Sequence, residues 1–190
     1  MSIYLIHLIK KSMATEKLKK ATPKAKKEKL GVNNPNALPK IEKIVVACGI
    51  GSLVTRKWHK DFEEFERNLI KITGQKPQMI KSKKSISNFK LREWLPVMLR
   101  VTLRKKKAHD FLDRFIKLVL PRVRDFSWLS AKSFDNQANL NIWVVNYNVF
   151  PELNVDDVVN NMWLQITIVT STDDVAKATS MLKELGIIFK

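Results

Sequence analysis

Residues 75–107 read QKPQMIKSKKSISNFKLREWLPVMLRVTLRKKK. The stretch holds eleven Lys or Arg residues and one acid, Glu93, so it contributes +10 to the chain's net charge of +17. Its second half alternates apolar residues with a period of two, the pattern of a β-strand with one buried face. A folded surface with this much positive charge indicates an anionic partner, and we interpret the rest of the chain as the scaffold that presents it.

The strand expected at 95–103 has two different faces. Its odd-numbered residues are all Leu or Val and are predicted to face the core, whereas Arg100, Thr102 and Arg104 are predicted to face outward. A short strand at 78–81 precedes it, and the segment between the two is polar and basic. Runs of charge are usually solvated, but eleven bases against one acid, threaded through a strand, favour a binding surface.

Charge is distributed unevenly along the chain. Residues 1–40 carry +8, residues 41–75 carry +1 and residues 108–190 carry −2. We therefore expect a basic, flexible extension at 1–38 and a single α+β domain at 39–190. No apolar run reaches the roughly 18 residues of a membrane span. Residues 1–12 are apolar and then basic, which leaves an import or anchor segment open, although Met13 is the favoured start of the chain.

Alternating and helical periodicities predict the order of the elements. The fold class expected from them is α+β, an antiparallel sheet with helices packed on one face, which leaves the other face and the loops free to bind a ligand. A helix cap is expected at Thr172. The expected strands are 41–48, 78–81, 95–103, 141–149 and 163–170, and the expected helices run from Arg56 to Gly74, from Ala108 to Pro121 and from Ser171 to Gly186.

Residues with catalytic or metal-binding chemistry are sparse. Cys48 is the single cysteine, so an internal disulfide and a cysteine-based zinc site are excluded, and it is interpreted as a small apolar residue ending a strand. The three histidines are scattered. Gly49 and Gly51 resemble part of a phosphate-binding turn, but Val54 stands where the third glycine belongs, so a tight strand-to-helix turn is favoured. No catalytic, metal or cofactor site is predicted.

Two alternatives stay open on the residues alone. An enzyme acting on nucleic acid would need a catalytic carboxylate or histidine near 76–107, where Glu93 is the only acid. A basic protein of the membrane surface would depend on residues 1–12. The favoured interpretation is a nucleic-acid-binding protein in which Lys and Arg contact phosphates, Ser82, Ser85, Ser87 and Asn88 add hydrogen bonds and Phe89 stacks on an unpaired base.

Several blocks in order resemble one known family. PKIEKIVVACGIG, ITGQKP, KSKKSISNFKLRE, VTLR, LPRVRDFSWLSAKSFD, VFPE and LQITIVTSTDD are similar to the successive signatures of the bacterial-type L5 family of large-subunit ribosomal proteins, which bind 5S rRNA. The likeness runs from about Pro39 to Lys190. It implies a ribosomal structural protein of the central protuberance that is not an enzyme.

The resemblance also implies partners and site residues. The partners would be 5S rRNA, large-subunit rRNA, the P-site tRNA and a small-subunit protein at an inter-subunit bridge, with no membrane. The residues expected to bind 5S rRNA are Ala47, Gly49, Gly51, Gln75, Lys76, Arg100, Thr102 and Arg104. The loop expected to approach the tRNA runs from Lys81 to Lys90 and offers Lys81, Lys83, Lys84, Ser85, Asn88, Phe89 and Lys90.

The chain departs from the family pattern at three places. Ala47 stands where the family usually has Asn, which removes a side chain able to hydrogen-bond to RNA. The glycine-rich turn of the family is replaced by the glycine-free residues 134–140, so a left-handed Asn136 is expected to make the turn between Phe134 and Leu140. The N-terminal helical segment of the family is replaced by the Lys-rich tail. A cytoplasmic ribosome of bacterial type is expected, with an organellar, mitochondrial ribosome as the alternative.

Overall fold

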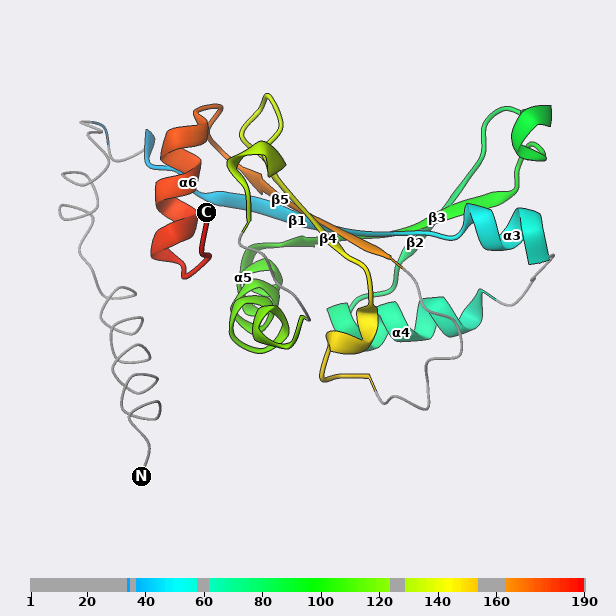
Figure 1. Cartoon of the computed structure of the whole chain (residues 1–190), viewed down its shortest axis with the longest axis horizontal. Coiled ribbons are helices and arrows are strands. Elements are labelled where there is room, and N and C mark those ends of the chain that lie inside the picture. Colours follow the sequence, from blue (N-terminus) through cyan, green and yellow to red (C-terminus); the bar gives the residue numbers. More distant parts are fainter. Residues whose placement is uncertain (1–33, 35–36, 58–61, 124–128, 154–162, 190) are drawn as a thin grey trace. The chain divides into compact units, whose positions relative to one another are not determined.

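The computed structural model describes residues 34, 37–57, 62–123, 129–153 and 163–189 (Figure 1). The chain divides into two compact units. The sheet unit comprises residues 41–127 and 140–169, and the small unit comprises residues 1–40, 128–139 and 170–190. The predicted single domain at 39–190 stays a prediction.

A five-stranded open sheet forms the sheet unit, in the order β2-β3-β1-β5-β4. The pairs β1–β3, β2–β3 and β4–β5 are antiparallel, which confirms the predicted fold class. The strands are β1 (Ile41–Gly49), β2 (Gln78–Lys81), β3 (Pro96–Arg104), β4 (Leu140–Val144) and β5 (Leu164–Thr170).

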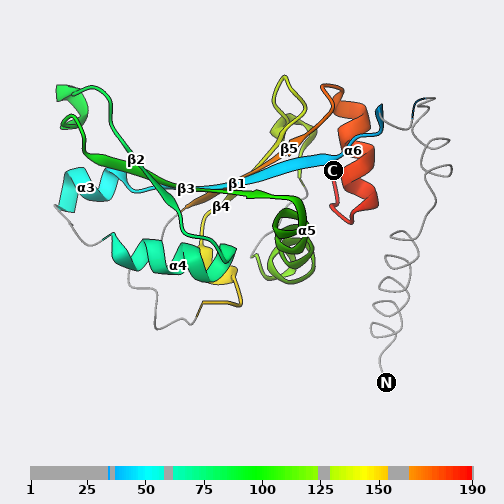
Figure 2. The same cartoon turned by 180° about the vertical axis from the view of Figure 1, so that it is seen from behind.

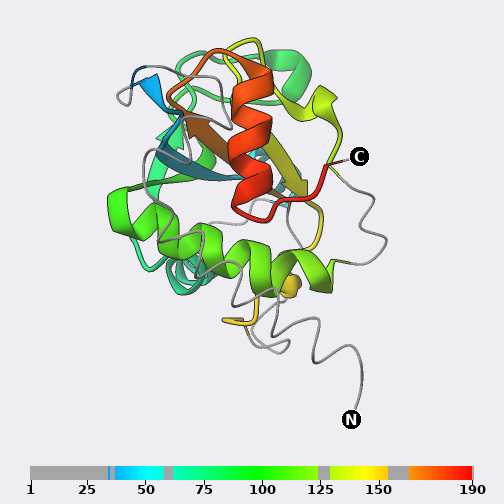
Figure 3. The ribbon, with the colours of Figure 1, turned by 90° about the vertical axis from the view of Figure 1, so that its left-hand side faces the viewer.

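Two helices lie on the same side of this sheet, below it in Figure 1 and Figure 2 and again along one side of the strands in Figure 3. They are α4 (Glu63–Thr73) and α5 (Lys105–Arg114). Each buries an apolar stripe at helical spacing, as predicted. The buried apolar residues are Phe65, Leu69 and Ile72 in α4 and Ala108, Phe111 and Leu112 in α5. No helix in the described part of the chain combines the length and the apolar character of a membrane span.

The helical run continues beyond α5 before the chain turns away. It continues as a π-helical segment, Phe115–Val119, and a 3-10 turn, Leu120–Arg122, in which Pro121 ends the helical run. Phe111, Phe115 and Phe150 stack with ring centroids 6.2 to 6.5 Å apart. These rings anchor α5 and the VFPE segment in one core.

The helix predicted from Arg56 onward is wrong in its start. Two helices stand there, α3 (Gly51–Lys57) and α4, and Trp58 lies outside the described residues. The chain turns directly from β1 into α3, because Ile50 N donates to Val97 O at 2.8 Å and fixes the turn against β3. The predicted stop is confirmed: Gly74 has φ +66°, the left-handed conformation that favours glycine.

The strand predicted at 141–149 is too long. β4 ends at Val144, and Tyr147–Val149 form a 3-10 turn. In a strand, side chains three positions apart point to opposite faces of the sheet. Tyr147 and Phe150 are three positions apart and are both buried, so this segment does not continue the strand. Burial of these two rings therefore outweighs the β-propensity of the sequence.

Two predicted turns of the small unit also differ. Asp174, not Thr172, caps α6 (Val175–Glu184): its carboxylate accepts from Ala176 N at 2.9 Å, while Thr172 Oγ1 accepts from Asp174 N. Ala138, not Asn136, takes the left-handed conformation, with φ +55°. The turn is held by Asp135, whose carboxylate accepts from Gln137 N, Asn139 N and Asn139 Nδ2 at 2.8 to 3.0 Å.

Candidate nucleic-acid interface

The face of the sheet opposite α4 and α5, here called the open face, carries the outward residues of β3. Leu99, Val101 and Leu103 are buried, as predicted, so the residues between them point to the other side of the sheet. These are Arg100, Thr102 and Arg104, of which both arginines are exposed. The alternation in the sequence therefore places the side chains as expected.

Residues of β1 and β2 pair with them across the open face. Ala47 lies opposite Arg100, Val45 opposite Thr102 and Lys43 opposite Arg104. On the other flank Gln78 pairs with Arg100, whose Nη2 donates to Gln78 Oε1 at 3.4 Å. The face thus has three cations and two polar groups on three adjacent strands. Ala47 contributes only a methyl group.

Gln75 meets Thr102 although they are 27 residues apart. Gln75 Nε2 donates to the Thr102 carbonyl at 3.3 Å. The turn that carries Gln75 is built by its neighbour: Thr73 Oγ1 donates to Leu69 O at 2.6 Å and to Gln75 O at 3.1 Å. Lys76 is exposed and pairs with Glu66 at 3.5 Å. Two of the predicted blocks, GQKP and VTLR, therefore form one site.

An ion pair supports this turn from behind. Arg114 at the end of α5 pairs with Glu152 of the VFPE segment and donates from Nη2 to Ile72 O in the last turn of α4. The three segments are joined by one half-buried guanidinium, because its planar fork offers several donors. Sequence reasoning did not single out either residue, and only their spacing in three dimensions identifies the pair.

Gly49 and Gly51 lie toward the other end of β1. Gly49 pairs with Met98. It lies four residues along β1 from Val45, a separation of about 13 Å in a strand. A Cβ on Gly51 would meet Val97 Cγ1 at 3.2 Å, so close packing on β3 accounts for that glycine. Nothing within 4 Å restricts Gly49. The structure brings Ala47, Arg100, Thr102, Arg104 and Gln75 together, and Gly49 continues the same face of β1 two residues beyond Ala47. Gly51 is set apart from them, because it begins α3.

The segment between β2 and β3 is an ordered hairpin rather than an open loop. Ser82 N donates to Leu95 O at 2.8 Å and Trp94 N to Ser82 O at 3.0 Å, and a bridge joins Ile86 to Leu91. A 3-10 turn, Ser87–Phe89, forms the tip. Figure 1 shows this hairpin projecting from the end of the sheet beside α3, away from α5.

The predicted tRNA-facing residues run from the end of β2, where Lys81 lies, through the hairpin to Lys90 just after its tip. Phe89 is 71 % exposed, so its ring is available for stacking. A groove separates the tip from α3. Its walls combine hydroxyl and amide side chains with apolar ones, and its two cations, Lys90 and Arg92, both follow the tip. The other predicted residues, Lys81, Lys83, Lys84, Ser85, Asn88 and Lys90, are all exposed. The groove is lined by Ser52, Thr55, Ser85, Ser87, Asn88, Phe89, Lys90 and Arg92, among others.

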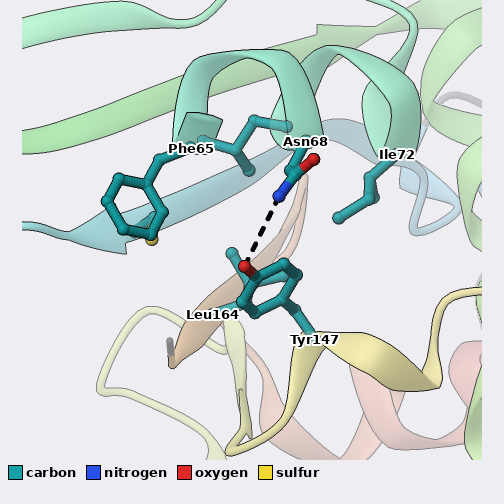
Figure 4. Close-up of a pocket in the computed structure, with 7 residues that line it drawn as sticks. Phe65, Asn68, Ile72, Tyr147 and Leu164 are labelled. Carbon is teal, nitrogen blue, oxygen red and sulfur yellow. Dashed lines mark hydrogen bonds between the residues drawn. The ribbon is translucent and has the colours of Figure 1, made fainter. Parts of the chain in front are cut away.

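Catalytic chemistry finds no support in the core. Cys48 faces a small apolar recess with Phe65 and Leu164 (Figure 4), and burial raises the pKa of its thiol to about 12. Asn68 Nδ2 donates to the Tyr147 hydroxyl there at 3.4 Å, and burial raises the pKa of Tyr147. A thiol with this pKa stays protonated and is a poor nucleophile.

Acids and histidines do not gather at the basic hairpin. Glu93 is exposed, and so is His109; His7 and His59 lie outside the described residues. In the part of the chain that the structure describes, no three His, Cys, Asp or Glu side chains are placed to hold a metal ion. The enzyme alternative therefore has no supporting site in the described residues.

Three exposed tryptophans are functional candidates that the sequence reasoning missed. Trp94 in the hairpin is 71 % exposed and has φ +66°, and Trp143 and Trp163 are 60 % and 61 % exposed. The alternation of residues 141–145 puts Trp143 on the face opposite Ile142 and Val144, which was a usable signal. Trp163 gave no such signal, because its exposure follows from where β5 begins.

Comparison with known proteins gives consistent matches over most of the chain. The family profile described as Ribosomal protein L5 matches residues 34–92, and the one described as ribosomal L5P family C-terminus matches residues 96–189. The large ribosomal subunit protein uL5 of Flavobacterium johnsoniae is 42% identical over 175 residues, covering 92% of this chain and 94% of the relative. That of Clostridium botulinum is 40% identical over 174 residues, covering 92% and 96%.

Proposed function

We propose that this chain, which belongs to the ribosomal protein L5 family, binds 5S rRNA through the open face of its sheet. As a member of that family it is a structural, non-enzymatic protein of the large ribosomal subunit, and its partner is ribosomal RNA. One observation carries the proposal. Two separate stretches of the chain bring together the side chains of Gln75, Thr102, Arg100 and Arg104. Lys43 and Gln78 lie beside them.

The division of labour on this face follows from its chemistry. Arg100, Arg104 and Lys43 neutralise phosphates, which supplies affinity and makes binding salt-dependent. Thr102, Gln78 and Gln75 offer hydroxyl and amide groups that fix the register of the RNA on the protein. Ala47 offers none, so the neighbouring Arg100 supplies the contact at this point of the face.

We assign the hairpin to a second RNA partner, the P-site tRNA. The hairpin, counted from the end of β2, carries four exposed lysines and the exposed Phe89, and it projects from the sheet, so it reaches a partner that the open face does not contact. In this proposal the protein lies in the central protuberance, contacts large-subunit rRNA as well as 5S rRNA, and meets a small-subunit protein at an inter-subunit bridge. The ribosome is of bacterial type, in the cytoplasm or an organelle.

Binding of 5S rRNA by the full chain tests the first assignment. At moderate salt we expect at least a tenfold preference for 5S rRNA over an unrelated RNA of equal length. Thr102→Val and Gln75→Ala are expected to reduce that preference, whereas Thr179→Val in α6 is the matched control and leaves it unchanged. Equal affinity for the two RNAs would exclude specific recognition.

Charge reversal tests the second assignment. Lys83→Glu with Lys84→Glu is expected to leave 5S rRNA binding within about twofold of wild type and to weaken tRNA-dependent steps of translation. Lys117→Glu with Lys183→Glu changes the net charge equally and serves as the control. If 5S rRNA binding collapses in the hairpin variant while the fold is intact, the two sites are not separate.

Ribosome-level measurements test the remaining partners. The protein is expected to co-sediment with the large subunit and to crosslink to 5S rRNA there. In assembled ribosomes it is expected to crosslink to one small-subunit protein, and fractionation of the cell assigns the compartment. Absence of the chain from purified large subunits would overturn the placement.

A further inference from the structure

An aromatic patch lies on β4 and β5, and no residue of it belongs to the sites proposed above. It consists of Trp143, Val145 and Trp163, which are 60 %, 51 % and 61 % exposed. Trp143 pairs with Gln165, so Trp163, two residues before Gln165, is its diagonal neighbour. Diagonal positions of an antiparallel pair lie about 7–8 Å apart, within reach of two indole rings.

The patch is on the same face as the basic residues. Leu164 lines the recess beneath α4 together with Cys48, so both side chains point to the helix side. Leu164 pairs with Val144, which is also buried. Their strand neighbours Trp143 and Gln165 therefore point to the open face, which also carries Ala47 and Thr102.

The two halves of the open face differ in chemistry. β1 and β3 contribute Lys43, Arg100 and Arg104, whereas β4 and β5 contain no charged residue. The polar groups of the second half are neutral and ordered. Asn141 Oδ1 accepts from Thr167 Oγ1 at 2.7 Å and from Gln165 Nε2 at 3.5 Å.

This combination fits unpaired nucleotides. Cations of one half take up phosphates, and exposed indole rings on the neighbouring half offer flat surfaces on which splayed bases stack. Amides and hydroxyls next to the rings can hydrogen-bond to base edges. A paired stem presents no free base face, so the patch would gain nothing from a duplex. A protein partner docked on the patch would not use the cationic residues that adjoin the patch on the same face.

We propose that Trp143 and Trp163 form a stacking platform for one or two unpaired RNA nucleotides, at the β4–β5 end of the open face. The inference rests on the proposed function, because the cationic half must hold the same RNA. The base edges are read by Gln165 and the Asn141–Thr167 pair.

Variants of the full chain, measured with 5S rRNA, test the platform. Trp143→Ala with Trp163→Ala is expected to raise Kd at least tenfold, because each stacked base contributes about 1–3 kcal/mol. The slope of log Kd against log salt stays at the wild-type value, since no phosphate contact is lost. Trp143→Phe with Trp163→Phe restores affinity to within about threefold, and Trp94→Ala, which removes an exposed indole from the hairpin, leaves it unchanged.

A second readout does not depend on the stability of the alanine variant. Tryptophan emission of the wild-type chain is expected to fall when 5S rRNA is added, and most of that quenching disappears in the double Phe variant. A fully paired RNA duplex of equal length is expected to bind the wild type and the alanine variant equally.

The outcomes separate the two proposals. If Arg100→Gln weakens 5S rRNA binding but the alanine variant binds as the wild type does, the platform is overturned and the proposed function stands. Failure of the Phe variant to restore binding, or a changed salt slope, also overturns the platform. If the alanine variant binds RNA normally but no longer joins large subunits, the patch docks a protein and the inference is wrong. If Arg100→Gln has no effect, the proposed function itself fails.

Discussion

Trp94 holds a backbone conformation that its side chain does not favour. Its φ is +66°, where the Cβ of an L-residue crowds the carbonyl oxygen, and its ring gains little in return because it is 71 % exposed. Backbone N–H of Trp94 donates to Ser82 O, so the hairpin itself imposes the conformation. Strain of this kind persists only where the surrounding structure determines it.

Replacement of Trp94 by glycine is therefore expected to stabilise the protein. Trp94→Gly should raise the free energy of unfolding by about 1 kcal/mol, because glycine adopts positive φ without penalty. Trp143→Gly, the same change at an exposed tryptophan of a strand with ordinary φ, should lower it by about 0.5–1 kcal/mol. Urea unfolding of both variants measures this, and destabilisation by Trp94→Gly would contradict the assignment of strain.

The carboxyl group of Asp135 makes the stability of the protein depend on pH. Partial burial raises the pKa of its carboxyl, and the hydrogen bonds from Asn139 and Gln137 outweigh this effect, so the pKa lies below its ordinary value. A carboxyl whose pKa is lower in the folded protein than in the unfolded chain stabilises the fold at pH values above its unfolded pKa, near 3.9. That stabilisation is lost as the pH falls through the folded pKa.

Acid unfolding should reveal this contribution. Between pH 6 and pH 2.5 the wild type is expected to lose more stability than Asp135→Asn, which has no proton to take up. The difference should stay below about 1 kcal/mol, because the carboxylate is largely exposed. Thermal unfolding across the pH range, with Asp110→Asn as control, tests it. Parallel pH profiles of wild type and Asp135→Asn would contradict the assignment.

At the scale of elements, α5 begins against its own dipole. Its first turn consists of Lys105, Lys106 and Lys107 and contains no acid, and Arg104 gives it no side-chain cap. The positive end of a helix disfavours cations, so this turn reduces stability. A cost without a structural return is typical of a surface kept for binding, and these lysines follow Arg104 of β3 directly along the chain.

Charge reversal at this helix start should separate stability from binding. Lys106→Glu with Lys107→Glu is expected to raise the free energy of unfolding by about 1 kcal/mol and to weaken RNA binding. Lys117→Glu with Lys183→Glu, where the cations lie in last turns, makes the same charge change and should lower stability. If both pairs destabilise the protein equally, the dipole argument is wrong.

For the whole molecule the distribution of charge matters more than its total. The sheet unit presents Lys43, Arg100 and Arg104 on one face and the exposed lysines of the hairpin at one end, while the chain from 108 to 190 is slightly acidic. Such a distribution attracts an RNA toward the open face and the hairpin.

Salt dependence measures how many of these cations contact phosphate. With 5S rRNA we expect a slope of log Kobs against log salt of about −4 or steeper, which means a loss of about 250-fold or more in affinity between 50 and 200 mM salt. Filter binding or fluorescence titration across that range gives the slope. A slope shallower than about −2 would show that most of the cations do not contact the RNA.

The sequence by itself determined the strands and the faces of the central part of the sheet. Strands 41–48, 78–81 and 95–103 agree with β1, β2 and β3 to within a residue or so, because a period-two pattern reports burial on one side. It also determined that Arg100, Thr102 and Arg104 face away from the core. These features depend on neighbours along the chain, so local sequence is enough to fix them.

Only the tertiary structure decided which distant residues meet and where local preferences fail. Gln75 reaches Thr102, and Arg114 reaches Glu152, through contacts between segments far apart in the chain. The end of β4 is set by burial of Tyr147 and Phe150, and Ala138 rather than Asn136 is forced to positive φ by the bonds of Asp135. The exposed Trp143 and Trp163 lie together because β4 and β5 pair in one register. Each of these outcomes depends on packing between elements, which no window of sequence contains.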